Sequence, residues 1–395
     1  MIKTQTNRAL TLLLIAFYGF ATIGIVSGAL GVSWIQIQAT FGLRLDALGI
    51  LLTASTVGRL ITAFSSGQLM ARFGAGRYLL AGSALIVVGL LGYVAAPVWT
   101  VLLVSAFVTG LGAGVIDACV NTFIAPRYSA SRLNWLHACF GLGLTLGPIL
   151  VTWLVIDLGQ SWRAAYGVLV GVQIVLLLAF LLTIRRWQDT PSLATGSESK
   201  AVPHASIQVT LRLTIMWLSL GLFFAYGGVE IGMGQLLNNL LVEGRAVDPR
   251  TAGFWVSLYW GSFTVGRMLI GVFIDRVGPR TLVRASFIGV VVGTLLIWWN
   301  PAIVVSFAGI ALVGFALAPV FPTLLSVTPD RVGVEHTPNA IGFQIGFAGL
   351  GAALLVGLAG VLAENLGKEF ISLFLVIVAL ATFGLHEFIL LRESS

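Results

Sequence analysis

The chain has 395 residues, of which 58% are hydrophobic and only 9% are charged, and its mean hydropathy is +1.00. Soluble domains carry about 25% charged residues, so this composition excludes a water-soluble globular protein and predicts an integral membrane protein. The net charge of +7 does not indicate a nucleic-acid partner, because most Lys and Arg residues lie on one predicted side of the membrane. We therefore expect a multi-pass protein of a bacterial-type inner membrane, with both termini cytoplasmic.

Twelve apolar segments follow one another along the chain, and each is long enough to cross a bilayer as a helix. A crossing with its connection takes about 30 residues, so this length accommodates about twelve crossings. We predict an all-α integral membrane protein with twelve transmembrane helices in two pseudo-symmetric six-helix bundles. The segments cover residues 9–38, 45–71, 76–96, 98–126, 132–156, 163–186, 211–241, 250–275, 281–299, 301–328, 338–364 and 369–391.

The longest polar interruption covers residues 187–209 and contains Pro, Gly and several Ser residues. This composition is typical of a flexible linker. We therefore predict an N-terminal bundle over residues 1–187, a cytoplasmic linker over 188–210 and a C-terminal bundle over 211–395.

The two predicted bundles repeat each other in sequence. The tetrapeptide Thr-Val-Gly-Arg occurs at residues 56–59 and again at 264–267, at matching positions in the second and eighth predicted helices. A glycine-spaced run with a basic turn follows each copy, at residues 67–74 and 271–278. A long internal repeat of this kind is typical of transporters that bind their substrate between two halves.

Only Asp117 and Glu230 of the fifteen acidic residues lie well inside predicted helices. Asp117 shares a helix face with Asn121, four residues later, and with Gly110 and Gly114 before it. The two glycines leave gaps into which a backbone or a substrate can approach closely. A carboxylate within the bilayer costs roughly 2.5–3.5 kcal/mol on insertion scales, so Asp117 is a functional candidate.

Two interpretations of Asp117 are open at this point. In the first, its carboxyl group contacts the substrate and also binds and releases a coupling proton, because burial makes the charged form costly. In the second, Asp117 forms a permanent ion pair with Arg59 and its role is structural. The two interpretations can be combined if Asp117 and Arg59 form an ion pair that breaks when Asp117 is protonated or when substrate binds.

Glu230 lies in a segment that is rich in glycine, which predicts a broken helix whose backbone lines a cavity. We expect Glu230 to bind substrate and to take part in proton coupling, with amide donors from Gln235 and Asn238. The alternative is a structural pair between Glu230 and Arg267.

Sugars present apolar faces and many hydroxyl groups, so their binding sites combine aromatic rings with amides and carboxylates. We expect Tyr259 or Trp260 to contact the sugar ring, and Gln344 and Asn121 to bind its hydroxyl groups. Trp34 is a further candidate near the end of the first predicted helix, although most of the eleven Trp residues should be membrane-interface anchors.

His137 has two possible roles, a structural hydrogen-bond donor or a proton relay, because its titration range suits proton transfer. The four His and two Cys residues lack the spacing of metal ligands, so we expect no metal site. No Walker sequence and no nucleophile elbow is present. We therefore expect no catalytic residues, no cofactor and no enzyme activity.

The turn at residues 271–278 resembles the Gly-x-x-x-Asp-Arg-x-Gly signature of the major facilitator superfamily. The resemblance implies a gating or ion-pair role for Asp275 and Arg276, and for Arg72 in the first copy, where Ala71 replaces the acidic residue.

A closer resemblance covers most of the chain. Gly112-Ala-Gly-Val-Ile-Asp117-Ala-Cys-Val-Asn121, followed by His137-Ala-Cys-Phe-Gly141 and Gly147-Pro148, is similar to the fucose permease branch of sugar–proton symporters. The resemblance implies a monosaccharide substrate and a protonatable acid at Asp117, where that permease has a glutamate. The second acid that the permease uses has no match in the first predicted helix.

These observations predict proton-coupled uptake of a monosaccharide or a similar small polar solute by a monomer in the lipid bilayer. One alternative is proton-linked efflux of amphipathic compounds, because Gly147-Pro148 partly resembles an antiporter signature. A second alternative is a non-transporting sensor with a carrier fold. A mostly polar cavity would favour sugar uptake, and a broad aromatic one would favour efflux.

Overall fold

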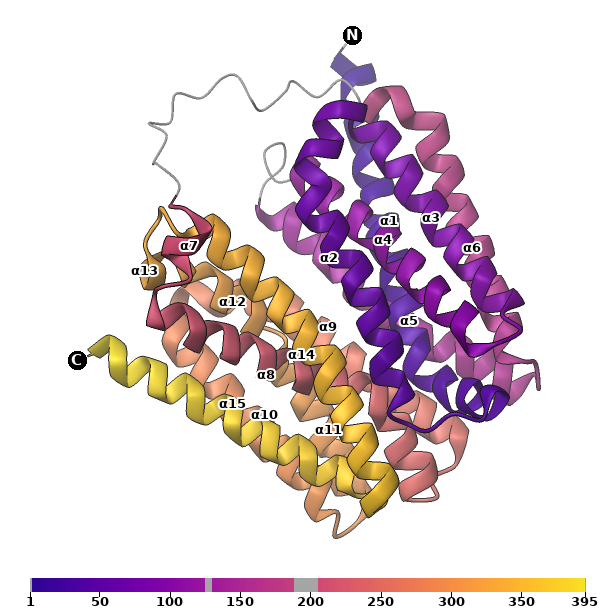
Figure 1. Ribbon diagram of the computed structural model, residues 1–395, viewed down its shortest axis with the longest axis vertical. Helices are drawn as coiled ribbons and strands as arrows, with labels where there is room; N and C mark the ends of the chain where they lie inside the picture. Colours follow the sequence, from indigo (N-terminus) through magenta and orange to yellow (C-terminus); the bar gives the residue numbers. More distant parts are fainter. Residues whose placement is uncertain (1, 125–129, 188–204, 395) are drawn as a thin grey trace. The chain divides into compact units, whose positions relative to one another are not determined.

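The computed structural model describes residues 2–124, 130–187 and 205–394, and every regular element in these ranges is a helix (Figure 1). The chain divides into two compact units. Unit 1 comprises Met1–Leu43 and Ile50–Gly196, and unit 2 comprises Arg44–Gly49 and Ser197–Ser395. Most of the predicted linker, residues 188–204, lies outside the described ranges, and its last residues form the short helix α7.

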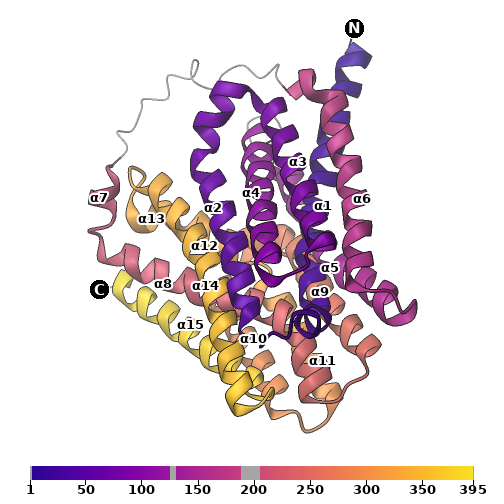
Figure 2. The ribbon, with the colours of Figure 1, turned by 45° about the vertical axis from the view of Figure 1, so that its right-hand side comes forward.

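Unit 1 contains six long helices that run alongside one another (Figure 2). Helix α1 packs against α5, and α3 packs against both α4 and α6. The elements are α1 (Ile2–Phe41), α2 (Ala47–Phe73), α3 (Ala75–Ala95), α4 (Trp99–Ile124), α5 (Ala130–Val151), η1 (Thr152–Asp157), α6 (Trp162–Thr183) and η2 (Ile184–Trp187).

Small residues bring α1 and α5 into close contact. A methyl group added at Gly24 or Gly28 of α1 would collide with the backbone of α5, and one added at Gly143 or Gly147 would collide with the backbone of α1. Lipid is as apolar as a leucine side chain, so transmembrane helices associate through close packing of this kind and not through a hydrophobic driving force.

Unit 2 has a comparable set of long helices, with α8 packed against α14 and α15, and α10 against α11 and α15. Helix α11 lies against α9. The elements are α7 (Ile207–Thr210), α8 (Thr214–Asn239), η3 (Leu240–Gly244), α9 (Pro249–Val277), α10 (Pro279–Trp299), α11 (Ile303–Leu317), α12 (Val320–Ser326), α13 (Thr328–Val332), α14 (Thr337–Leu366) and α15 (Phe370–Ser394).

The repeated basic turn has the same backbone geometry in both units. Gly74 ends α2 with φ 79° and ψ 151°, and Gly278 ends α9 with φ 78° and ψ 145°. Residues with a Cβ atom rarely adopt positive φ values, so glycine is needed at both turns. The sequence repeat therefore corresponds to a structural repeat.

Eleven helices of the described chain are long and apolar enough to span a membrane, and the charged helix α9 is a twelfth long helix. Two details differ from the sequence expectations. The predicted segment 301–328 is divided into α11 and α12, because Pro319 lacks the N–H group that would continue the helix. The predicted break around Glu230 was wrong, since α8 is continuous from Thr214 to Asn239.

Candidate transport site

Asp117 and Asn121 form a hydrogen-bonded pair in the second half of α4. The Asn121 side-chain amide donates to Asp117 Oδ1 at 2.9 Å and to the Asp117 backbone carbonyl at 3.0 Å. Both side chains are half-buried. The helical spacing of four residues makes this contact possible, because it places the two side chains on one face.

Arg59 of α2 lies close enough to interact electrostatically with the Asp117 carboxyl group. For these two described residues, the structure shows no N–O contact within 4.0 Å, the limit of an ion pair. The Asp117 carboxyl group is therefore held by Asn121 and faces a nearby guanidinium group without a direct bond to it.

The glycines of α4 explain how Arg59 comes so near. A methyl group added at Gly114 would lie 2.6 Å from the Arg59 carbonyl oxygen and 3.0 Å from its Cα atom, and one added at Gly110 would collide with the Ser55 carbonyl group. The gaps expected on this face are thus filled by the backbone of α2. Because Gly110 and Gly114 have no side chain, the backbones of α2 and α4 approach closely, and this close packing brings Arg59 near Asp117.

A second group of charged and phenolic side chains lies between α8 and α9 in unit 2. Glu230 interacts electrostatically with Arg267 and with Tyr226. The Tyr259 hydroxyl group donates to the backbone carbonyl of Glu230 at 2.8 Å, and the Arg267 guanidinium group lies 4.2 Å from the centre of the Phe263 ring. Each unit therefore has a carboxyl group in a long helix that interacts electrostatically with an arginine of another long helix.

Tyr226 was not among the residues expected from the sequence. Its side chain is buried and lies four residues before Glu230 on the same helix face. This spacing was a signal that could have identified it, because an aromatic hydroxyl group one helical turn from a buried carboxylate is a natural partner for it.

The glycines of α8 are packing positions within a continuous helix. A Cβ atom at Gly227 would collide with the Ala348 carbonyl group of α14, and one at Gly234 would collide with the Trp260 ring. Trp260 and Tyr259 are fully buried. The Trp260 indole nitrogen has no hydrogen-bond acceptor among the described residues.

The other expected binding residues lie in different surroundings. Gln344 is buried; its amide nitrogen donates to Ser219 Oγ at 2.7 Å and its oxygen accepts from Thr328 Oγ1 at 3.0 Å. The remaining residues are buried or half-buried: Gln235 and Asn238 on α8, Trp34 on α1 beside the Trp99 ring, and His137 on α5 beside the Phe20 ring.

The residues of the repeated basic turn are only partly described. Arg72 is exposed, and its guanidinium group lies 5.4 Å from the centre of the Phe73 ring. The side chains of Asp275 and Arg276 lie outside the described part of the structure. No group of three or more metal-ligating side chains comes together among the residues that are described.

The comparisons with known proteins agree with this architecture. The chain matches the sequence profile of the Major Facilitator Superfamily over residues 11–243 and 218–395. It is 22% identical to the glucose/mannose transporter GlcP of Bacillus subtilis over 269 residues, which are 66% of this chain and 65% of that protein. It is 30% identical to the Major facilitator superfamily domain-containing protein 4A of Pongo abelii over 184 residues, 46% of this chain and 34% of that protein.

Two solved structures share the fold over nearly the whole chain. A structure of the nucleoside transporter NupG has a TM-score of 0.79 at 14% identity, covering 96% of this chain and 99% of its own. The Escherichia coli fucose:proton symporter FucP has a TM-score of 0.64 at 17% identity, covering 95% of this chain and 98% of its own. Likeness at these identities establishes the fold alone.

The fold and the long apolar helices of the described residues define a multi-pass membrane protein. The chain belongs to the Major Facilitator Superfamily, and the assignment to this superfamily from its sequence is confirmed. The matches span less than two thirds of the length of the curated relatives named above.

Proposed function

We propose that the protein takes up a monosaccharide together with protons, by alternating access between two six-helix bundles. The observation that carries this proposal is Asp117, a carboxyl group inside α4 that is positioned by Asn121 and faces Arg59 without an ion pair. The names of GlcP, a glucose/mannose transporter, and FucP, a fucose:proton symporter, support the substrate class and the coupling ion.

Asp117 is the proposed coupling residue because its charge has a nearby partner that is not locked to it. When a proton binds the free carboxylate oxygen, the attraction between Asp117 and Arg59 disappears, while the Asn121 amide can still donate to the backbone carbonyl. The protonation state therefore changes the force between α2 and α4. That change is the step by which a proton can favour one conformation over the other.

We propose that Glu230 of unit 2 binds substrate and is a second protonatable group. Its backbone carbonyl is held by Tyr259, and its carboxyl group interacts electrostatically with Arg267. We propose that further amide and aromatic side chains bind the sugar in addition to the Glu230 carboxyl group. His137 is proposed as a proton relay. Besides Glu230, the proposed sugar-binding set comprises Trp34, Asp117, Asn121, Gln235, Asn238, Tyr259, Trp260 and Gln344.

The remaining features of the proposal come from the sequence. The distribution of Lys and Arg supports an inner membrane location with cytoplasmic termini, and the polar stretch supports a cytoplasmic linker between bundles over residues 1–187 and 211–395. We propose a monomer, gated at the repeated turn by Arg72, Asp275 and Arg276.

The decisive experiment measures substrate-induced proton flux in proteoliposomes, with glucose, mannose, fucose and uridine added outside. Acidification of the lumen by one or more sugars is the expected result. Asp117→Asn should abolish proton-driven accumulation and leave sugar counterflow in place. Asp248→Asn is the matched control: it makes the same chemical change at an exposed residue that caps α9, a position that asparagine also suits.

Each outcome bears on a distinct part of the proposal. Accumulation by Asp117→Asn at the level of the parent protein would remove Asp117 from the coupling role. Acidification by uridine alone would replace the sugar with a nucleoside. No flux with any solute, in protein shown to be folded, would favour efflux over uptake.

A further inference from the structure

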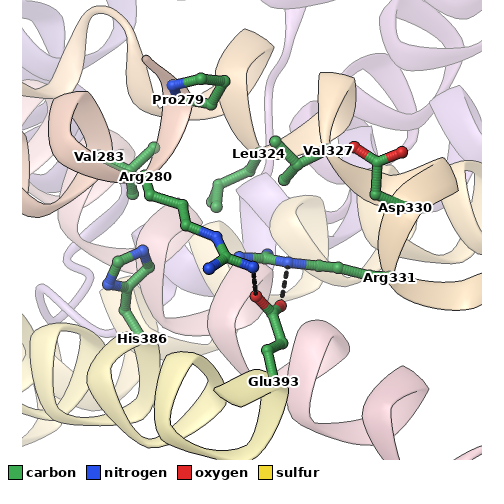
Figure 3. Close-up of a pocket in the computed structure, with 9 residues that line it drawn as sticks. All are labelled: Pro279, Arg280, Val283, Leu324, Val327, Asp330, Arg331, His386 and Glu393. Carbon is green, nitrogen blue, oxygen red and sulfur yellow. Dashed lines mark hydrogen bonds and ion pairs between the residues drawn. The ribbon is translucent and has the colours of Figure 1, made fainter. Parts of the chain in front are cut away.

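A cavity of about 340 Å³ lies at one end of unit 2 and is lined by none of the candidate site residues described above (Figure 3). The start of α10, the end of α12, helix α13 and the end of α15 surround it. One part of its lining is apolar, formed by Pro279, Val283, Leu324 and Val327. The other part carries arginine, histidine and acidic side chains.

A single carboxylate is shared by two arginines in this cavity. Glu393 Oε2 lies 3.0 Å from Arg280 Nη2, and Glu393 Oε1 lies 2.8 Å from Arg331 Nε (Figure 3). Two positive charges thus face one negative charge at this point. Asp330 also lines the cavity, so the lining as a whole is close to neutral and any anion must compete for the guanidinium groups.

Arg331 is unusual because its side chain is only 7% exposed, whereas the Arg280 side chain is 67% exposed. Among the described residues, its ion pair with Glu393 through Nε is its only hydrogen-bond or ion-pair contact. A guanidinium group carries five N–H donors, so its two terminal nitrogens keep donors for a further ligand in the cavity. Burial and the nearby charge of Arg280 both lower the pKa of Arg331, while Glu393 raises it.

The chemistry of these groups favours a phosphate group as the ligand. Arginine pairs bind phosphate oxygens through parallel N–H bonds, and a desolvated guanidinium gains most from such contacts. The apolar wall beside the arginines suits a ligand that joins a phosphate group to an apolar body. The cavity also lies at the ends of the membrane-spanning helices α10 and α15, where phospholipid headgroups are found.

We propose that this cavity binds a phosphate group between Arg280 and Arg331, and that the Glu393 carboxylate occupies the same guanidinium groups when no phosphate is bound. Glu393 is then an internal competitor at the end of α15. Exchange of Glu393 for phosphate releases the end of α15 from α10 and α13.

The test is a thermal-shift titration of the purified full-length protein in neutral detergent. Inorganic phosphate, short-chain phosphatidylglycerol and short-chain phosphatidylcholine serve as three separate probes, and stabilisation of the folded state reports binding. Arg331→Gln should weaken phosphate-group binding about tenfold or more, because hydrogen bonds to charged groups are strong. Glu393→Gln should tighten binding about tenfold, because it removes the competitor.

The opposite signs of these two effects distinguish a ligand site from a structural ion pair, whose loss would only destabilise the protein. Arg77→Gln is the matched control, since Arg77 is an exposed arginine shortly after the equivalent turn of unit 1. Stabilisation by phosphatidylglycerol alone identifies a lipid headgroup, and stabilisation by inorganic phosphate identifies a soluble phosphate compound. Absence of a shift with all three probes, or equal affinities in the parent protein and both variants, overturns the proposal.

Discussion

Gly114→Ala tests whether close contact between α2 and α4 holds Arg59 beside Asp117. The added methyl group would lie 2.6 Å from the Arg59 carbonyl oxygen and 3.0 Å from Arg59 Cα. Both are backbone atoms, so the collision is relieved only if the two helices move apart. Overpacking of this kind costs about 1–3 kcal/mol, and the better helix propensity of alanine offsets about 0.5–1 kcal/mol.

A net loss of roughly 1–2 kcal/mol corresponds to a fall of several degrees in unfolding temperature, at about 2–4 °C per kcal/mol for 150–250 residues. Proton-driven accumulation should fall as well, because Arg59 moves away from the Asp117 carboxyl group. The assays are thermal unfolding in detergent and solute accumulation in proteoliposomes under a proton gradient.

Gly67→Ala is the control, since Gly67 lies on α2, the helix that Gly114 of α4 contacts, and nothing approaches its added methyl group within 4 Å. Its unfolding temperature should stay equal or rise, and its transport should be unchanged. Parent-like stability and transport in Gly114→Ala would refute the reasoning, because the α2 backbone would then not be in contact with α4 at this position.

Three further predictions concern unit 2. Glu230→Gln should weaken substrate affinity, and unchanged binding in a competition assay would indicate a purely structural pairing with Arg267. Gln344→Leu should lower the free energy of unfolding by about 1–3 kcal/mol, because the substitution removes two buried hydrogen bonds and leaves the Ser219 hydroxyl group without this partner, while Thr328 still donates to the Leu324 carbonyl; an unaltered thermal transition would contradict this. Arg245→Gln should destabilise far more than Arg284→Gln in the same thermal assay, since the Arg245 side chain is 4% exposed and the Arg284 side chain is 52% exposed. Equal losses would show that burial does not govern these ion pairs.

The class of protein could be predicted from the sequence, because a lipid environment restricts the secondary structures that a chain can form. Backbone groups in hydrocarbon must bond within their own segment, so long apolar stretches predict helices. The segment boundaries agree with the structure to within several residues for most helices, and the repeated turn at Gly74 and Gly278 has nearly identical backbone angles. The internal repeat, which can be recognised from short sequence motifs, therefore identified the repeated architecture.

The contacts inside the candidate site needed the tertiary structure. A stripe of glycines indicates that something approaches closely, but the approaching group is decided by helix packing. On α4 it is the α2 backbone beside Gly114, and on α8 it is the Trp260 ring beside Gly234. Gln344 shows the same limit: the sequence led us to expect that its amide binds a sugar hydroxyl group, and the fold pairs this amide with Ser219 and Thr328.

By itself the sequence determined the membrane class, the helices, the repeat and the two carboxyl groups within them, because each depends on composition or on spacing along one helix. Only the tertiary structure decided which charges meet. Arg280, Arg331 and Glu393 are far apart in the chain and come from three different elements, yet they share one ion-paired cavity. Such contacts depend on how whole helices pack, and no local pattern of residues encodes that arrangement.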